Sequence, residues 1–418
     1  MKKTKKWART RHEVVWFLLF QIFALWAKIR YHAKVDSYRK YSKTPCVLLY
    51  NHVTGFDQFF VAISFGRPVY FVATEDIFSN GFISKLLRFL VAPIPIRKHT
   101  VDLKAMKNIL QIVKEGKSIA LAPEGNRTYS GRTVHMKDSV ASLCKKLKLD
   151  IVLYKIEGGY GTQPRWSDSV RKGRMHCHVS KVLKPEDYAD MSEEDLYALI
   201  KEELYTDEAT DTTRFIGSKR AEYLERAMYV CPDCGFSTFE SKGNKIKCLK
   251  CDKTIVYNED TSLSGEGYDF PYRFVADWYD YQNEYVNSVD LRTFTDKAVY
   301  EDEVSLYRVI VYKKKELLEK NVKLSLYGDR IVVKGPAFGE KTLDFKGITG
   351  IACMGRNKLN IEYDKTLYQI KGSKRFNALK YLNFCYRYNN IISKENASAS
   401  VEAQNDSRGE VNDQFLGI

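Results

Sequence analysis

Short apolar runs, rich in β-branched and aromatic residues, alternate with helical stretches between Pro45 and about residue 205. A crossover between neighbouring parallel strands needs a long connection, usually a helix, so this alternation predicts an α/β domain with a mostly parallel sheet. The expected strands are 46–50, 69–73, 92–96, 119–122 and 151–156, and the expected helices lie near 57–65, 80–90, 101–114, 137–147 and 192–204.

A basic and apolar N-terminus precedes this domain. The chain has a formal charge of +15, and residues 1–50 hold 12 Lys and Arg against two acidic residues, so this stretch alone supplies +10. The charge flanks an apolar segment, 14–27, that carries Trp16 and Trp26. A helix of that length reaches only about 21 Å, short of a hydrocarbon core of about 30 Å. We expect a helix that lies in a membrane interface rather than a simple span; the alternatives are a core helix and a signal peptide, for which no clear cleavage site follows.

The second half of the chain is expected to hold smaller modules. A basic connector leads to a cysteine-rich module, an aromatic-rich helix, a series of short alternating strands and a last amphipathic helix. Short antiparallel strands closed by one C-terminal helix are the order of a small, β-rich PH-like domain. The polar end of the chain predicts a disordered tail. The aromatic helix is 272–285, the strands are 306–311, 322–326, 330–333, 341–344, 348–352, 358–362 and 367–370, and the last helix is 375–388.

A chain of 418 residues is too long for one ordinary core. The patterns divide it into 1–35, the basic flanks and membrane-associating helix; 36–212, the α/β domain; 213–258, the connector and cysteine module; 259–391, the aromatic helix and PH-like β domain; and 392–418, the tail.

A histidine and an aspartate follow the first expected strand. His52 and Asp57 are five residues apart, which on a regular helix would separate them by about 140°. They can meet if His52 lies on the turn after the strand and Asp57 lies in the first turn of the next helix, with Gly55 easing the bend. Asp57 could then accept the Nδ1 proton of His52, and Nε2 could take a proton from a hydroxyl. Such a pair needs no nucleophilic serine when the substrate is itself an alcohol.

Two further polar segments follow expected strands. Glu124, Gly125 and Arg127 offer a carboxylate, a flexible turn and a guanidinium that can bind phosphate. Arg97 ends another apolar run, with a solvated charge at a helix start as the alternative. The C-terminal ends of the strands form one edge of an open α/β sheet, where ligands bind. We therefore expect these residues beside the His–Asp pair.

These segments resemble the motifs of the lysophosphatidate (PlsC-type) glycerolipid acyltransferases. The resemblance covers about residues 14–205 and includes the N-terminal apolar anchor. Asn126 replaces the hydroxyl residue usual in the third motif, P-E-G-[ST]-R, and the fourth motif, at 151–154, lacks its usual proline. The matching residues are Asn51, His52 and Asp57 of the first motif, N-H-x4-D, Arg97 of the second, and Pro123, Glu124, Gly125 and Arg127 of the third.

The resemblance implies a specific reaction. His52, oriented by Asp57, would deprotonate the sn-2 hydroxyl of 1-acyl-glycerol 3-phosphate, and the alkoxide would attack the thioester of acyl-CoA or acyl-carrier protein. The implied place is the cytoplasmic face of the cell membrane, in monotopic or peripheral association, with membrane lipid and acyl-carrier protein as partners. Arg97 and Arg127 would hold the acceptor phosphate, and Glu124 and Gly125 would shape its pocket.

Four of the nine cysteines form two C-x2-C pairs, Cys231 with Cys234 and Cys248 with Cys251. Four thiolates on two tight turns fit tetrahedral zinc, and such a closed zinc ribbon is structural because no ligand position stays open. Rubredoxin-like iron is the alternative, but the second pair lacks the glycine that follows the first, so zinc is expected. The other five cysteines are scattered, which fits a reducing compartment.

Other functions remain open from the sequence alone. The acceptor could be glycerol 3-phosphate, another lysolipid or a glycolipid. The chain could also be a non-catalytic membrane adaptor, although His52, Asp57, Glu124 and Arg127 are all intact. A nucleic-acid binder would use the cysteine module and its lysines. Two-thirds of the net charge lies around the apolar segment instead, so no nucleic-acid partner is expected.

Overall fold

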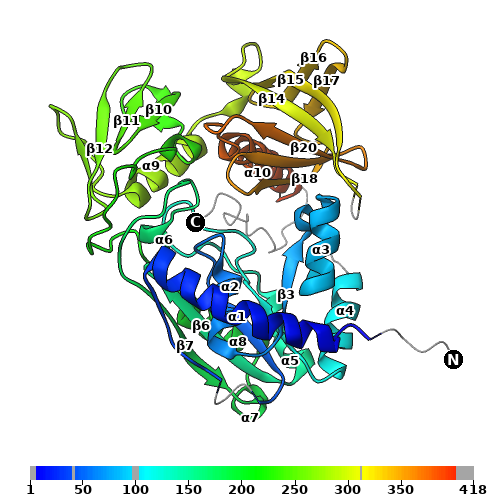
Figure 1. The fold of residues 1–418 in the computed structure, drawn as a ribbon. Helices are drawn as coiled ribbons and strands as arrows, with labels where there is room; N and C mark the ends of the chain where they lie inside the picture. The colour runs from blue at the N-terminus through cyan, green and yellow to red at the C-terminus, as the bar shows by residue number, and fades with distance from the viewer. Residues whose placement is uncertain (1–5, 40–42, 97–102, 311–312, 402–418) are drawn as a thin grey trace.

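The structure is a computed structural model that describes residues 6–39, 43–96, 103–310 and 313–401. Figure 1 shows two lobes, with α1 lying across the front of the lower lobe and the C-terminal strands in the upper one. The lower lobe holds one sheet with its helices. The upper lobe holds the cysteine module, α9 and a second large sheet.

A seven-stranded sheet with the order β1-β7-β6-β2-β5-β3-β4 forms the centre of the lower lobe. The predicted α/β domain with a mostly parallel sheet is confirmed, because β6, β2, β5, β3 and β4 are all parallel neighbours. All five residues of β2 are buried, as expected for a central parallel strand covered on both faces. The strands are β1 Ala33–Val35, β2 Cys46–Tyr50, β3 Val69–Thr74, β4 Ile94–Ile96, β5 Ser118–Leu121, β6 Asp150–Glu157 and β7 Met175–Leu183.

Two strands of this sheet were not predicted. β7 runs antiparallel to β6, and β1 is parallel to β7 at the edge. β7 alternates between buried and more exposed residues at its start, as a strand with one solvated face does. Because its exposed positions are polar, it forms no continuous apolar run and was not predicted. The three residues of β1 are too few to give a pattern.

Helices cover the sheet and extend beyond it. α1 is longer than the apolar segment that predicted it: its 22 residues reach about 33 Å, so the argument from length against a membrane span does not hold. α1 is the one helix of the described chain that is long and apolar enough to cross a membrane by length and composition. The helices are α1 Thr10–Tyr31, α2 Asp57–Phe65, η1 Glu75–Ser79, α3 Phe82–Leu90, α4 Leu103–Lys114, α5 Ser139–Leu147, α6 Gly159–Thr162, α7 Pro185–Tyr188 and α8 Glu193–Leu204.

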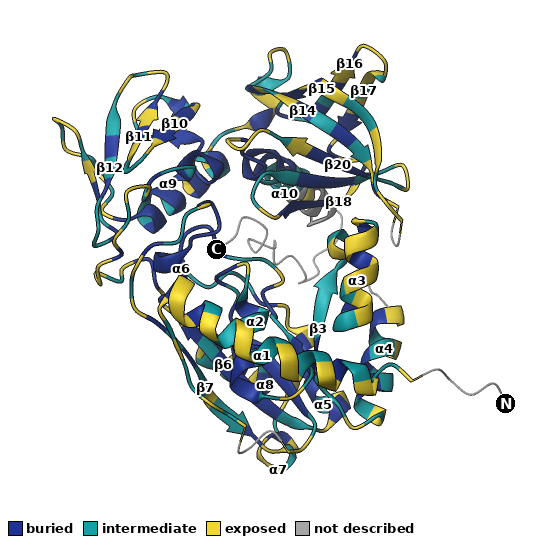
Figure 2. Cartoon of the chain, in the orientation of Figure 1, coloured by how far each residue is buried: buried dark blue, intermediate teal, exposed yellow. Residues whose placement is uncertain are grey.

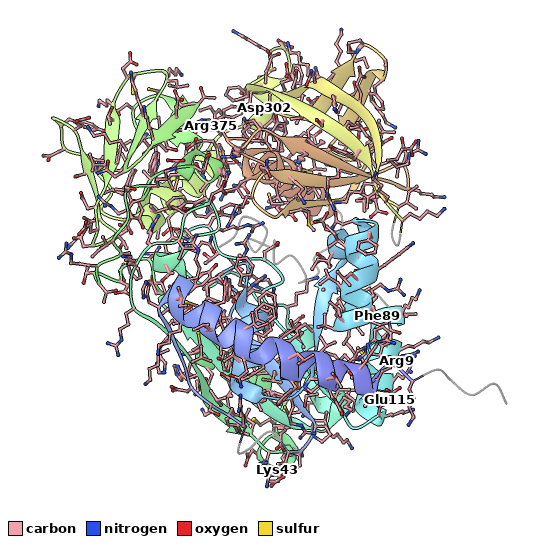
Figure 3. The ribbon with its side chains drawn as sticks, in the orientation of Figure 1. Arg9, Lys43, Phe89, Glu115, Asp302 and Arg375 are labelled. Atoms are coloured by element: carbon pink, nitrogen blue, oxygen red, sulfur yellow. The ribbon has the colours of Figure 1, made fainter. Side chains whose placement is uncertain are left out.

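α1 presents one face to the lobe and another to the outside, as Figure 2 shows by its bands of exposed and buried residues. Ala27 and Tyr31 are buried against α2, whereas large apolar side chains remain exposed on the other face. The N-terminal end is fixed to α3 and α4, where Figure 3 labels Arg9, Phe89 and Glu115 together: Glu115 accepts hydrogen bonds from the backbone of 7 and 8. The exposed apolar residues are Val14, Phe17, Leu18, Ile22, Leu25 and Ile29 on α1, and Phe82, Ile83, Leu86 and Phe89 on α3.

The expected β-rich C-terminal region is present as a seven-stranded antiparallel sheet with the order β17-β16-β15-β14-β20-β19-β18. Its likeness to a PH domain stays a prediction. α10 continues to Val401, into the segment predicted as a tail, and 402–418 lie outside the described residues. The strands are β14 Tyr300–Arg308, β15 Glu316–Leu326, β16 Arg330–Gly335, β17 Gly339–Asp344, β18 Ile348–Met354, β19 Lys358–Tyr363 and β20 Thr366–Gly372, and the helix is α10 Leu379–Val401.

The cysteine module and the helix after it share one hydrophobic core with this sheet. Residues of the predicted connector, such as Leu224 and Met228, are buried in the same core, so the two halves of the chain are joined by packed residues rather than by an exposed linker. The elements are η2 Leu224–Arg226, β8 Val230–Cys231, β9 Gly235–Phe236, β10 Phe239–Lys242, β11 Lys245–Cys248, β12 Thr254–Tyr257, β13 Leu263–Gly265, α9 Val275–Ser288 and η3 Leu291–Phe294.

Candidate active site

His52 and Asp57 meet as the spacing predicted. β2 ends at Tyr50, α2 begins at Asp57, and His52 Nδ1 lies 2.7 Å from Asp57 Oδ2. His52 therefore sits on the turn and Asp57 in the first helical turn. Gly55 is not in the left-handed region, so its expected part in the bend does not depend on a positive φ.

Asp57 is fully buried, and hydrogen bonds surround its carboxylate. Oδ2 accepts from the Val53 backbone N–H at 3.0 Å as well as facing His52. Oδ1 accepts from the Thr54 N–H at 2.9 Å and from the Thr54 hydroxyl at 2.6 Å. A buried carboxylate with this many donors is held in one position, and it in turn fixes the orientation of the imidazole ring.

Glu124 supports His52 from the neighbouring strand end. Its Oε1 accepts the His52 backbone N–H at 2.8 Å, and its Oε2 accepts the Val134 N–H at 3.3 Å. Burial raises the pKa of Glu124 to about 8, against the opposing effect of these two hydrogen bonds. The sequence predicted a residue that shapes the acceptor pocket. Both oxygens of Glu124 accept backbone N–H groups, one of them from His52, and its role in shaping the pocket stays a prediction.

Arg127 lies beside Gly55, because a Cβ on this glycine would be 3.6 Å from Arg127 Nη1. Nη1 is buried and has no hydrogen-bond partner among the described residues. Burial and the charge of Arg165 lower the pKa of Arg127 to about 10. Gly125 adopts a φ of +64°, a backbone conformation that favours glycine. A buried guanidinium with an unpaired N–H is suited to bind an anion.

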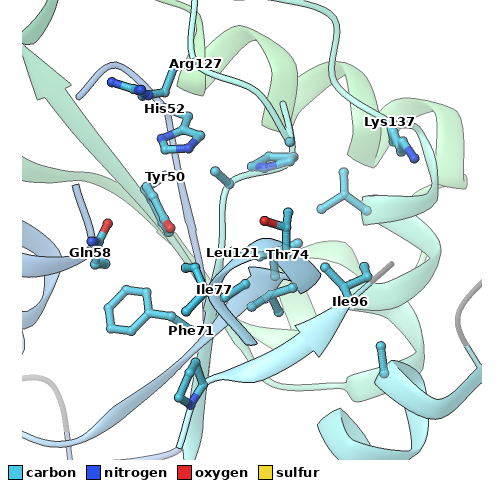
Figure 4. A pocket seen from close by; sticks show the side chains of 18 of the residues that line it. Tyr50, His52, Gln58, Phe71, Thr74, Ile77, Ile96, Leu121, Arg127 and Lys137 are labelled. Atoms are coloured by element: carbon cyan, nitrogen blue, oxygen red, sulfur yellow. The ribbon is translucent and has the colours of Figure 1, made fainter. Parts of the chain in front are cut away.

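A cavity of about 1640 Å³ opens next to these residues. His52, Gly125 and Arg127 line it, and Figure 4 shows His52 and Arg127 at one end, with apolar side chains such as Phe71 and Leu121 farther along. This arrangement can hold a molecule with a charged head near His52 and an apolar chain along the strands.

Arg97 and Asn51 also belong to the motifs that carry the resemblance. Arg97 lies outside the described residues. Asn51 is fully buried and does not face the cavity: its amide bonds both the N–H and the C=O of Ile156, at 2.8 and 2.9 Å. Asn51 therefore ties the end of β2 to β6 and keeps the turn that carries His52 in place.

The four clustered cysteines come together as expected. The Sγ atoms of Cys231, Cys234, Cys248 and Cys251 all lie within 4.8 Å of one another, and all four are free thiols. None of the four is among the residues that line the cavity, and Cys231 and Cys248 are buried. This donor set fits one tetrahedral zinc with four sulfur ligands.

The structure also gathers a group that the sequence did not indicate. Glu157, His176 and His178 lie together on β6 and β7, with ligand atoms within 4.8 Å. His176 Nε2 already bonds Asp36 Oδ2 at 2.8 Å, and Glu157 is half-exposed. The period-2 spacing of the two histidines on β7 is the signal that could have placed them on one face.

Comparison with known proteins agrees with the geometry of the lower lobe. Residues 28–156 match the acyltransferase family. The chain is 25% identical over 130 residues to the chloroplastic 1-acyl-sn-glycerol-3-phosphate acyltransferase BAT2 of Brassica napus, covering 31% of this chain and 38% of that protein. It is 24% identical over 144 residues to the chloroplastic 1-acyl-sn-glycerol-3-phosphate acyltransferase LPAT1 of Arabidopsis thaliana, covering 34% and 40%. The chain thus spans about two-fifths of the length of these relatives.

Among solved structures, the 1-acyl-sn-glycerophosphate acyltransferase PlsC from Thermotoga maritima aligns with a TM-score of 0.39 at 18% identity, over 47% of this chain and 80% of that one. The family match contains the His52–Asp57 turn and the 123–127 segment, and it ends at residue 156. The family comparison supports an acyltransferase domain in the first half of the chain.

Proposed function

We propose that this chain is an O-acyltransferase that moves a fatty acyl group from acyl-CoA or acyl-carrier protein to the sn-2 hydroxyl of 1-acyl-glycerol 3-phosphate, giving phosphatidate. The observation that carries the proposal is the His52–Asp57 contact of 2.7 Å at the end of a large cavity that Arg127 also lines. The two plant relatives, named for the same reaction, support the choice of acceptor.

The proposed reaction uses the contact between His52 and Asp57. With Nδ1 bonded to Asp57, His52 uses Nε2 to take the proton of the acceptor hydroxyl, and the oxygen forms a bond to the thioester carbonyl carbon. The tetrahedral intermediate then breaks its C–S bond, and the thiolate leaves with the proton that His52 held. Asp57 stabilises the protonated imidazole during this sequence. No covalent acyl-enzyme is needed.

Recognition of the acceptor is assigned to the guanidinium of Arg127, which is called the anion site below. The unpaired Nη1 of Arg127 offers a charge-assisted hydrogen bond to the acceptor phosphate, in the same cavity that His52 lines. Glu124 accepts the His52 backbone N–H and retains its predicted role in shaping the acceptor pocket. Arg97 retains its predicted role as a second phosphate ligand.

Association with a membrane surface is part of the proposal. The exposed apolar faces of α1 and α3 carry Arg11, Lys28, Lys85 and Arg88 nearby, a combination that suits a helix lying in the interface of anionic lipid. α1 lines the cavity with Phe20 and Phe23, so a lipid acceptor could pass from the interface into the site. The cytoplasmic face remains the proposed side.

The test uses the purified full chain with a labelled acyl thioester and a panel of lysolipids. We expect product with 1-acyl-glycerol 3-phosphate and its loss in His52→Ala. His176→Ala is the matched control, because His176 makes a similar contact with Asp36 at 2.8 Å but does not line the cavity. Equal product formation in His52→Ala and wild type would contradict the proposed role of the His52–Asp57 pair. The absence of product with any acceptor and either donor would contradict the proposed acyltransferase activity.

A further inference from the structure

The cavity beside His52 has walls from both halves of the chain. On the lower side it is bounded by β2, β3, α2 and the 122–127 segment. On the upper side it is bounded by residues 348–351 of β18 and by one face of α10. The lining residues of α10 are Cys385, Tyr386, Asn389, Asn390 and Ser393. The site is therefore incomplete without the C-terminal β domain.

Direct bonds hold the two walls together at the charged end. Arg165 is buried and donates to Arg127 O at 2.8 Å through Nη1 and to Cys353 O at 3.0 Å through Nη2. Cys353 belongs to β18, so one side chain links the anion site to the opposite wall. Asp168 then bonds Arg226 at 2.7 Å and Arg356 at 3.3 Å, and Arg356 follows directly on the turn after β18.

A second set of bonds joins η1 of the lower lobe to the C-terminal β domain. Asp76, in η1 of the lower lobe, pairs with Lys315 and with Lys358 at 3.2 Å, and it accepts from Gln369 Nε2 at 2.9 Å. Burial opposes ionisation of Asp76, but the charges of Lys358 and Lys315 outweigh it and lower its pKa to about 2. The C-terminal domain is thus fastened on both sides of the cavity rather than resting on one.

The charged end has more cationic than anionic groups. Arg127 Nη1, Arg165 Nε and Arg356 Nε are each buried without a hydrogen-bond partner in the described chain. The charges of Arg165 and Arg356 both act on Arg127. Asp168 contacts Arg356, but it is shared with Arg226. Arg165 and Arg356 are not among the residues that line the cavity, but their charges add to the positive potential at Arg127, which does line it. An anion beside Arg127 would therefore be stabilised by more than one positive charge.

We propose that the C-terminal β domain forms the second wall of the substrate site, with β18 and α10 facing the acyl chain. Arg356, which lies outside the cavity lining, adds its positive charge to that of Arg127 at the phosphate end. The ligand class is an amphiphile with one apolar chain and a phosphate ester, and the phosphate belongs either to the acceptor lipid or to the CoA of the donor. This inference rests on the proposed acyltransferase function.

The first experiment compares Arg356→Ala with wild type in the full chain. We expect KM for the phosphate substrate to rise about tenfold with kcat nearly unchanged, because a charge is lost from binding and not from the chemical step. Arg308→Ala is the matched control, since Arg308 is half-exposed on β14 of the same domain and pairs with Glu316 in a surface bond of 3.3 Å. Arg356→Lys should restore much of the affinity.

The two phosphate sources are separated by varying one substrate while the other is saturating. A rise in KM for lysophosphatidate, with no change towards a monoacylglycerol acceptor, assigns the charge to the acceptor. A rise in KM for acyl-CoA, absent with an acyl thioester that lacks phosphate, assigns it to the donor. A merely structural role is tested with Asp168→Asn, which removes the partner of Arg356 and keeps its charge. The same rise in KM in Asp168→Asn as in Arg356→Ala would overturn the electrostatic role.

The apolar wall is tested with Asn390→Trp, which should narrow the cavity and shift acyl preference towards shorter chains. Ile392→Trp adds the same side chain on the same helix outside the cavity lining. Equilibrium binding of 1-acyl-glycerol 3-phosphate, measured by calorimetry in detergent, separates this inference from the function. Binding that weakens in Arg356→Ala supports the shared site even if no acyl transfer is found. Wild-type binding and turnover in both Arg356→Ala and Asn390→Trp refutes the shared site even if the chain is an acyltransferase.

Discussion

Replacing Asp57 with asparagine tests the arrangement of the candidate active site most directly. The carboxylate accepts from His52, Val53 and Thr54, and it offers no donor. An asparagine has one acceptor and one donor end. If its NH2 faces His52, the imidazole must present Nδ1 as an acceptor and carry its proton on Nε2, where it cannot take one from the substrate. If its NH2 faces Thr54, two donors point at each other, and the Thr54 backbone N–H loses its acceptor.

The expected magnitude follows from these contacts. Loss of correct base catalysis lowers kcat by about 10²- to 10⁴-fold, which corresponds to about 3–5 kcal/mol of transition-state stabilisation. KM for the acceptor should change little, since Arg127, the proposed phosphate ligand, is not altered. Leaving a buried N–H beside the amide costs about 1–3 kcal/mol of folding free energy. A drop in the midpoint of thermal unfolding should therefore accompany the loss of activity.

The assay is steady-state acyl transfer, followed by release of free thiol and normalised to folded protein. Asp36→Asn serves as the control, because it removes an Asp–His bond of similar length, 2.8 Å against 2.7 Å, at a half-exposed position outside the cavity. It should retain wild-type kcat. A folded Asp57→Asn enzyme with kcat within a few-fold of wild type would refute the assignment of His52 as a base oriented by Asp57.

Three further predictions concern other parts of the molecule. Because the pKa of Glu124 is raised from 4.5 to about 8, the folded state holds this proton more tightly, so its stabilising contribution is present below pH 4.5 and is lost as the pH rises to 8. Glu124→Gln stays neutral, and its unfolding free energy relative to wild type should rise across this window by about a few kcal/mol in denaturant titrations; a constant difference would contradict the shift. Metal analysis should find about one zinc per chain, and chelation or Cys248→Ser should unfold the upper lobe, whereas Cys385→Ser, at a buried cysteine outside the cluster, should keep the zinc. Ile22→Asp, on the exposed face of α1, should weaken co-sedimentation with anionic vesicles without lowering stability, while the same charge at exposed Gln21 should have a smaller effect; equal binding in both variants would exclude this face as the membrane contact.

The sequence by itself determined the local chemistry. The spacing of His52 and Asp57, placed between a strand and a helix, was enough to predict their contact, because a short turn leaves few ways to arrange five residues. The two C-x2-C pairs predicted the cysteine cluster for the same reason. The parallel sheet followed from the alternation of elements, and with it the edge where His52 and the 123–127 segment meet.

Only the tertiary structure decided what surrounds this chemistry. That both oxygens of Glu124 accept backbone N–H groups depends on contacts between segments far apart in the sequence, which no local pattern encodes. The strand β7 and the exposed face of α1 depend on which side of each element is covered. Arg165 and Arg356 come near Arg127 because a hydrogen bond from Arg165 to the Cys353 carbonyl and an ion pair of Arg356 with Asp168 join residues far apart in the sequence. Such pairings are set by packing of the whole chain, so the wall that the C-terminal domain gives to the cavity could be found only after folding.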